Sequence, residues 1–381
     1  MYRLKPDYEQ SKQRIEAFWE RQVLDRPVVQ FSLARPPGEQ TPLPESRHAT
    51  ARERWLDAGY QARWHLAKLS NHEFLGDTLP VAFPNLGPEL FAAFYGCPLH
   101  FGDYGTSWTE PILHDWAQMD AIRMDPASPY LRKLHEMTDA FLEVGRDTFI
   151  TGMTDWHPGG DWLAALRDPA NLAMDLILEP EGVKRLLARA EDDYFRVYDE
   201  FYRKLRAHGQ PITTWLPLAA EGRYYVPSND FAYMISPAMF NEFFLPGLAR
   251  ECRFLERSIY HLDGPGALRH LDAILSIPEL DAVQWVYGAG NEGFHRWVEV
   301  YRRIQAADKG VEVICAYDEV GAVMENLSPQ GLYLSVEGVP TREAGLEMLA
   351  RLTRWCAGRR WPGAGDEAGS SGHLTGGEPR P

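Results

Sequence analysis

The alternation of short apolar runs with amphipathic stretches most limits what this chain can fold into. Apolar runs of strand length occur at residues 26–34, 77–83, 148–153, 210–218, 258–262, 281–286, 311–317 and 331–336. Most are followed by a segment whose apolar residues recur with helical spacing. Strand–helix alternation with short connections requires parallel strands. A closed (β/α)8 TIM barrel and an open doubly wound sheet both satisfy this, and the strand count without a mid-chain linker favours the barrel.

The two ends of the chain depart from this alternation. Apolar residues at Ile15, Phe18, Trp19 and Val23 predict a helix ahead of the first strand, so we expect an N-terminal helical extension. From about residue 362 the sequence is rich in Gly and Ser, which is typical of disorder. We therefore expect a single barrel domain over 1–361 and a disordered tail over 362–381.

Charge and cysteine content exclude several classes of protein. The formal net charge of −15 disfavours binding to nucleic acid or to anionic lipid, since both need clusters of Lys and Arg. The 4 cysteines form no CxxC pattern, which suits a reducing compartment. The N-terminus has no apolar leader, and no run approaches the roughly 20 apolar residues of a membrane helix. We expect a cytoplasmic protein that binds neither nucleic acid nor membranes.

Polar and aromatic residues follow several of the predicted strands. In a barrel, the carboxyl ends of the strands form the active site. The residues at or near these ends are Asp155, Trp156, His157, Trp215, Asp230, His261, Asp263, Gln284, Trp285, Tyr287 and Glu337. Their gathering at one end of the predicted barrel indicates an enzyme.

Each polar residue also has a structural interpretation. Asp263 is a candidate N-cap for a helix that begins near Pro265. His261 is a candidate core histidine, and Asp155, His157 and Asp230 are candidate turn residues.

A glycine pattern resembles a dinucleotide-binding motif. Gly288-x-Gly290-x-x-Gly293 lies between a strand and a helix, and Glu312 follows about 20 residues later. Its late position in the chain favours a glycine-rich barrel loop instead.

Two kinds of chemistry fit the polar set. Two carboxylates in one pocket acquire different pKa values and so furnish an acid and a base. A histidine with one or two carboxylates binds a divalent metal such as zinc, manganese or iron. The sequence contains no HExxH, GxSxG or GxxxxGK[ST] motif.

Several segments resemble the uroporphyrinogen decarboxylase superfamily, which also holds the methyltransferases that act on methylated corrinoid proteins. The resemblance runs from about residue 8 to 356. Its segments are "RIEAFWERQVLDRPVV", "EPEGVKRLL", "ISPAMFNEFFLPGLARECRFL" and "YHLDGPGALRHLDAILSIPELDAVQWVYGAGN". It implies a (β/α)8 barrel.

The resemblance favours the methyltransferase branch. True decarboxylases of this family carry an arginine-rich N-terminal motif that grips substrate carboxylates, and here that stretch holds only Arg26 and Arg35. The methyltransferases carry His-x-Cys-Gly and a later cysteine that hold zinc. The matching residues here are His261-Leu262-Asp263-Gly264, so Asp263 stands where those relatives carry a cysteine.

The sequence therefore predicts methyl transfer or demethylation of a small methylated metabolite. His261, Asp263, Asp155 and Asp230 are the predicted catalytic residues, and His261, Asp263 and Glu337 the predicted ligands of zinc or another divalent metal. The predicted substrate-binding residues are Trp156, His157, Trp215, Arg223, Tyr224, Trp285 and Tyr287.

Alternative functions stay open at this point. One is decarboxylation of a porphyrinogen or other carboxylate substrate, and another is non-catalytic binding of a small molecule or a corrinoid protein. The methyltransferase interpretation implies a corrinoid protein as partner, and a homodimer is also open.

Overall fold

A computed structural model describes residues 2–102 and 105–357 of the chain. The predicted tail over 362–381 lies outside the described residues. The strands are β1 (Val28–Ala34), β2 (His72–Gly76), β3 (Val81–Ala82), β4 (Leu99–Phe101), β5 (Ser107–Thr109), β6 (Ile150–Thr151), β7 (Tyr224–Tyr225), β8 (Arg257–Asp263), β9 (Ala282–Val286), β10 (Gly310–Ala316) and β11 (Leu332–Glu337).

Helices account for much of the remaining chain. The α-helices are α1 (Tyr8–Trp19), α2 (Ala51–Leu56), α3 (Ala58–Ser70), α4 (Leu90–Ala93), α5 (Pro129–Gly145), α6 (Gly160–Arg167), α7 (Pro169–Leu178), α8 (Pro180–Ala207), α9 (Pro237–Met239), α10 (Leu245–Phe254), α11 (Leu271–Leu275), α12 (Val298–Ala306), α13 (Val320–Asn326) and α14 (Arg342–Cys356). Two short 3₁₀ helices matter for the site: η3 (Asp230–Met234) and η5 (Pro265–His270).

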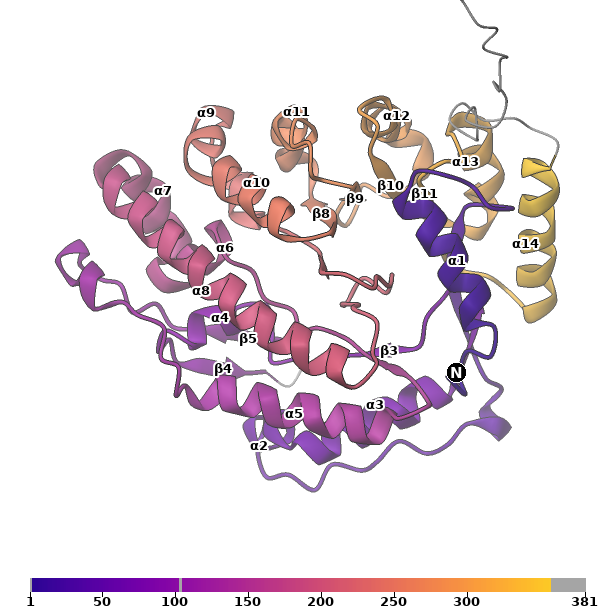
Figure 1. Ribbon diagram of the computed structural model, residues 1–381, viewed down its shortest axis with the longest axis horizontal. Helices are drawn as coiled ribbons and strands as arrows, with labels where there is room; N and C mark the ends of the chain where they lie inside the picture. The colour runs from indigo at the N-terminus through magenta and orange to yellow at the C-terminus, as the bar shows by residue number, and fades with distance from the viewer. Residues whose placement is uncertain (1, 103–104, 358–381) are drawn as a thin grey trace, which may run out of the picture.

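The main sheet is parallel except at one edge. Its order is β2-β1-β11-β10-β9-β8-β7, with β2 antiparallel to β1. A separate parallel pair joins β3 to β6, and an antiparallel pair joins β4 to β5. Helices lie outside these strands, with α9 to α14 forming an arc around β8 to β11 (Figure 1). The first parallel strand therefore pairs with the last, although the strand ladders among the described residues do not form a closed ring.

The predicted alternation is present, with local differences. Strands β1 and β8 to β11 form where apolar runs predict them, and α1 confirms the N-terminal helix. Residues 210–218 were predicted to be a strand and instead carry only an isolated bridge between Ile212 and Ala220. Pro211 and Pro217 explain this difference, because neither has an N–H to donate to a ladder.

The segment before Pro246 departs from α-helical geometry. Residues Phe240–Phe244 form a π-helical turn, and α10 continues from Leu245. A proline removes one backbone donor and crowds the preceding turn, so the helix widens there.

No helix in the described parts of the chain combines the length and apolarity that crossing a membrane requires.

Candidate functional site

A cavity of about 710 Å³ opens at the carboxyl ends of β6 and β8. Asp155 and His157 follow β6, His261 lies within β8, and Asp230 begins η3. Trp215 and Phe231 contribute aromatic rings to the wall. This volume suits a small organic ligand. Among the described residues no lysine or arginine lines the cavity, whereas five carboxylates do: Glu89, Asp155, Asp161, Asp168 and Asp230.

His261 is held from three sides. Its backbone N–H donates to the Pro227 carbonyl at 2.9 Å. Its Nδ1 lies 2.5 Å from Oε1 of Gln284, and the Trp215 ring meets it edge-on with centroids 5.4 Å apart. An amide oxygen can only accept, so Nδ1 carries a proton and Nε2 is the nitrogen available to the cluster. His261 is half-buried and lines the cavity, which contradicts the core interpretation.

Asp263 and Asp230 join His261 in one cluster. One ligand atom from each of the three side chains lies within 4.8 Å of the others. The residue that caps η5 is Gly264 and not Asp263, so the helix-cap interpretation of Asp263 is wrong. Burial raises the pKa of the Asp263 carboxyl, the His261 charge lowers it, and the Asp230 charge raises it. A histidine nitrogen with two carboxylates is a donor set that divalent metals accept.

Asp155 and His157 form a second pair in the cavity wall. Oδ1 of Asp155 lies 3.0 Å from Nε2 of His157, whose side chain is 9% exposed. Burial alone would lower the His157 pKa. The hydrogen bond to Asp155 and the charges of Asp155, Asp161 and Glu251 outweigh burial, so the pKa is raised to about 9. The imidazole is therefore charged at neutral pH, and the pair holds a proton beside the cavity.

Asp161 positions Asp230 from the neighbouring helix. Its two carboxylate oxygens accept the backbone N–H groups of Asp230 and Phe231 at 3.0 and 2.8 Å. These bonds fix the start of η3 and hence the place of the Asp230 side chain. Burial and the Asp230 charge raise the Asp161 pKa to about 6, against the opposing effect of His157 and the two N–H groups.

Two of the predicted pocket tryptophans lie in the core instead. Trp156 packs against Phe94 and Phe201, and Trp285 packs against Trp297. Both are fully buried, and neither lines the cavity. Side chains alternate between the two faces of a strand-like segment, so the residue beside a cavity-facing side chain points toward the helices.

Arg223 and Tyr224 lie at the other end of the strands. Arg223 precedes β7, pairs with Asp199 at 2.9 Å and stacks on the Tyr202 and Phe254 rings. The Tyr224 hydroxyl donates to the Leu216 carbonyl inside the core. The structure therefore does not bring either residue to the cavity as predicted.

Glu337 and Tyr287 lie outside the cavity wall as well. Glu337 ends β11, which is separated from β8 by β9 and β10. Three strand spacings of about 4.8 Å place β11 about 14 Å from β8, too far for a shared ion. In the described part of the chain, Asp230 occupies the third position of the cluster that the sequence assigned to Glu337.

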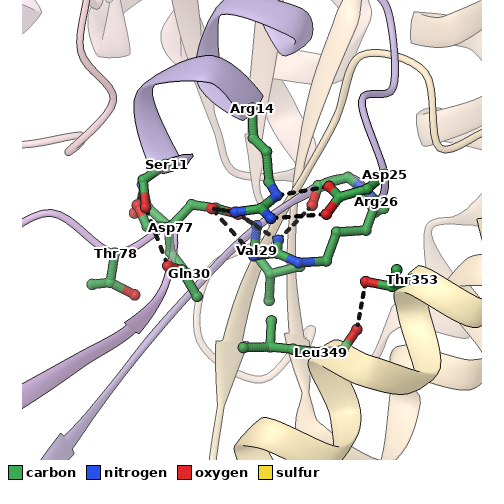
Figure 2. A network of polar contacts seen from close by, with 12 residues as sticks. Ser11, Arg14, Asp25, Arg26, Val29, Gln30, Asp77, Thr78, Leu349 and Thr353 are labelled. Carbon is green, nitrogen blue, oxygen red and sulfur yellow. Dashed lines mark hydrogen bonds and ion pairs between the residues drawn. The ribbon is translucent and has the colours of Figure 1, made fainter. Parts of the chain in front are cut away.

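The two arginines of the stretch that matches the decarboxylases' N-terminal motif pair with carboxylates of the protein itself. Arg26 is buried, and its guanidinium forms two contacts with Asp77, at 2.5 and 3.2 Å. Figure 2 shows Arg14 bridging the same Asp77 to Asp25. Arg35 lies near Glu73 at 3.7 Å. These contacts leave no cationic clamp for a polycarboxylate substrate at this stretch.

Some residues of the site were not predicted. Asp161 follows the Pro158-Gly159-Gly160 turn, and a carboxylate at the start of a helix after such a turn was the available signal. Glu312 was considered only as part of the glycine-rich motif, yet it is buried within β10. Its burial opposes a role in binding a ribose at the surface of a dinucleotide site.

Comparisons with known proteins give a fold and no family. No protein-family model matches the chain, and no curated protein matches it. Among solved structures, a methyltransferase from Methanosarcina mazei is similar, with a TM-score of 0.58 and 12% sequence identity over 90% of this chain and 98% of that chain. The two proteins therefore share an overall fold across nearly their whole lengths.

Proposed function

We propose that this protein is a methyl-transfer enzyme that acts on a small methylated metabolite in the 710 Å³ cavity. The fold shared with a methyltransferase supports the reaction class. The cluster of Asp230, His261 and Asp263 at the cavity carries the proposal, because it supplies a metal-ligating set at the same strand end as the zinc motif of the methyltransferases that the sequence resembles.

The proposal includes the fold and the family. We assign the chain to the uroporphyrinogen decarboxylase superfamily, near its corrinoid-dependent methyltransferases, and its strands to a (β/α)8 barrel. Pairing of β1 with β11 supports this assignment. So do backbone hydrogen bonds that connect β3 to β6 and continue from Met153 to Thr213.

A divalent ion fits the three side chains. Donor atoms bound to one zinc ion at about 2.0–2.2 Å lie up to about 4 Å apart, so small side-chain rotations bring this cluster to one ion. The His261 Nε2 and the carboxylates of Asp230 and Asp263 would hold it. Such an ion activates a bound nucleophile or polarises a substrate heteroatom.

The charge of the cavity selects the substrate. Five carboxylates and no lysine or arginine line it in the described residues, so a polyanionic porphyrinogen would meet repulsion. Neutral or cationic methylated compounds fit instead, with Trp215 and Phe231 as aromatic surfaces for methyl groups. This charge balance disfavours the decarboxylase alternative.

The Asp155–His157 pair supports the departure of the donor group. In methyl transfer, the acceptor's electron pair forms the new bond to carbon, and the donor heteroatom keeps the pair of the broken bond. A neutral donor then needs one proton, which this pair holds at the cavity wall at neutral pH. A corrinoid carried by a partner protein is the proposed acceptor.

Reduced free cobalamin tests the proposal as a methyl acceptor. The full chain, loaded with Zn²⁺ or left metal-free, is incubated with methylated amines, ethers and thioethers, and methylcobalamin is followed by absorbance. We expect transfer from at least one donor class that requires the ion and is lost in His261→Ala. Donor binding without turnover would instead favour a binding module, and carbon dioxide release from uroporphyrinogen would favour decarboxylation.

A further inference from the structure

The cavity runs alongside helix α6. Asp161 at the start of this helix, Ala165 within it and Asp168 just after it all line the cavity wall. The residues from Asp161 to Asp168 rise by about 10 Å along the helix axis. The cavity therefore has two ends, one at Asp161 and the proposed metal cluster and the other at Asp168.

Glu89 lies at the same end of the cavity as Asp168. The Leu113 N–H donates to the Leu166 carbonyl at 3.0 Å, so the segment after β5 is held against the last turn of α6. Thr109 of β5 donates to Oε2 of Glu89 with its N–H at 2.5 Å and with its hydroxyl at 2.8 Å. These bonds bring the Glu89 carboxylate to the Asp168 end of the cavity, which both side chains line.

Three of the five cavity carboxylates are engaged at the other end. Asp155 contacts a cavity histidine at 3.0 Å, and both oxygens of Asp161 accept backbone N–H groups. Asp230 belongs to the proposed metal cluster. Glu89 and Asp168 are the two carboxylates that this leaves for the far end of a ligand.

Each of these two carboxylates is fixed through one oxygen, and its other oxygen is available. Thr109 holds Oε2 of Glu89. Oδ1 of Asp168 accepts the N–H groups of Ala170 and Asn171 at 2.9 and 3.1 Å. In the described part of the chain, no hydrogen-bond donor contacts Oε1 of Glu89 or Oδ2 of Asp168. Both side chains are half-buried, so a cation that enters would meet two acceptors that are already oriented.

The arginine next to Asp168 is engaged elsewhere. Arg167 pairs with Asp175 at 2.6 Å and donates to the Leu113 and His114 carbonyls, both at 3.0 Å. Among the described residues no lysine or arginine lines the cavity. The negative charge at this end is therefore complementary to a cation on the ligand.

The wall between the two ends is apolar. Ala164 and Ala165 of α6 line it between Asp161 and Asp168, and the Phe91 ring lines the same cavity. Such a wall suits a short alkyl chain that joins a polar group at each end.

We propose that Glu89 and Asp168 are specificity-determining residues that bind an ammonium group of the substrate. The substrate class is then an amine that carries a methylated oxygen or sulfur at the other end of a short alkyl chain. The place of the methylated atom, beside the cluster of Asp230, His261 and Asp263, rests on the proposed function. The ammonium subsite itself rests only on the geometry of the cavity.

Two probes that differ only in charge test the subsite. Methoxybutylammonium and methoxypentane have the same length, and one ends in an ammonium group where the other ends in a methyl group. Calorimetric titration of the metal-free full chain compares their affinities, so binding is measured apart from turnover.

Two replacements remove the charges and keep the structural roles of the side chains. Asp168→Asn keeps a helix cap for α7, and Asn tolerates the positive φ of 83° at this position. Glu89→Gln keeps an oxygen that accepts from Thr109. Glu337→Gln is the matched control, because it makes the same change of charge at a strand end outside this cavity.

We expect the wild type to bind the ammonium probe about tenfold more tightly than the neutral probe, as a charge-assisted hydrogen bond predicts. Each replacement should weaken binding of the ammonium probe alone, the double variant should bind both probes equally, and Glu337→Gln should match the wild type. If one variant does not fold, the other decides the question.

Three results would overturn the inference: no binding of the ammonium probe, equal affinities for the two probes in the wild type, or an unchanged preference in the folded variants. The proposed function fails separately. Selective ammonium binding without methyl transfer to cobalamin would overturn that function and leave the subsite standing. Methyl transfer from methoxypentane as fast as from methoxybutylammonium would support the function and overturn the subsite.

Discussion

Two clusters of charged side chains in this molecule differ in how their charges balance. Near the start of β1, Arg14 and Arg26 meet Asp25 and Asp77 in a closed set of ion pairs (Figure 2). In the cavity wall, carboxylates outnumber the histidines, and no lysine or arginine among the described residues balances their negative charge. The first set is satisfied by the protein itself. The second is left to be satisfied by a ligand, which is why we place function there.

The balanced cluster predicts the largest loss of stability. Replacing Asp77 by Ala leaves the buried Arg26 without its main partner, and Arg14 and the Val29 N–H each lose one. Breaking a buried ion pair costs about 3–5 kcal/mol, so we expect about 4 kcal/mol in the free energy of unfolding from urea titration.

Glu73, which is half-buried and pairs with Arg342 and Arg35 near the surface, is the matched control for Asp77. Glu73→Gln should cost no more than about 1 kcal/mol. Equal losses for the two variants would show that the buried cluster does not carry the stability assigned to it.

The unbalanced cluster predicts loss of metal binding with little loss of stability. His261→Ala and Asp263→Asn each remove a proposed ligand, so we expect Zn²⁺ affinity to fall by more than the roughly 10–100-fold typical of outer partners. Calorimetric titration measures this change. Glu337→Gln is the matched control, since Glu337 lies three strand positions from His261, and a comparable loss there would restore the original ligand assignment.

The predicted metal ligands and the residues that cluster in the structure differ at one position, and this difference shows what a sequence pattern cannot predict. His261 and Asp263 were predicted because both belong to one strand end, whose position the apolar run determines. Asp230 joins them through a contact between η3 and Asp161, which depends on tertiary packing. Glu337 also ends a strand, but strand order and spacing around the sheet decide the distances between such ends.

The aromatic residues also show that a position in the sequence does not decide which face of a strand a side chain occupies. Trp156 and Trp285 each neighbour a residue of the polar site, so two-residue alternation directs them into the core. The mixed α/β class and most strand positions could be predicted, because apolar periodicity encodes them, although residues 210–218 form only an isolated bridge. The register that places Glu312 beside Gln284 and Tyr333 could not be predicted, because packing of the complete sheet determines the register between strands.

Three buried titratable groups in and near the cavity also predict how stability depends on pH. The folded-state pKa values of His157, Glu251 and Asp161 are raised to about 9, 7 and 6. For Glu251 and Asp161, burial is the main cause. The folded state then binds more protons than the unfolded state, so these groups favour folding at low pH, and that contribution is lost as the pH rises through each value.

Asp155→Asn tests the His157 part of this dependence. It removes the negative partner of His157, whose pKa should fall, so stability should decline less steeply between about pH 6.5 and 9. Urea titrations across this range, with the His157 imidazole followed by NMR, measure both quantities. An unchanged slope with an unchanged His157 pKa would show that Asp155 does not hold the proton.

The smallest effect is expected at Arg223, which belongs to neither cluster. Its half-exposed guanidinium pairs with Asp199, lies 3.9 Å from a Glu256 oxygen and stacks on two aromatic rings. Arg223→Met therefore keeps most of the packing and loses these two ion pairs. We expect a loss of about 0.5–1 kcal/mol in the free energy of unfolding and no change in Zn²⁺ affinity or methyl transfer. A selective loss of activity with intact stability would support the original assignment of Arg223 as a substrate-binding residue. It would also mean that a cation at the opposite end of the strands balances the charge of the ligand.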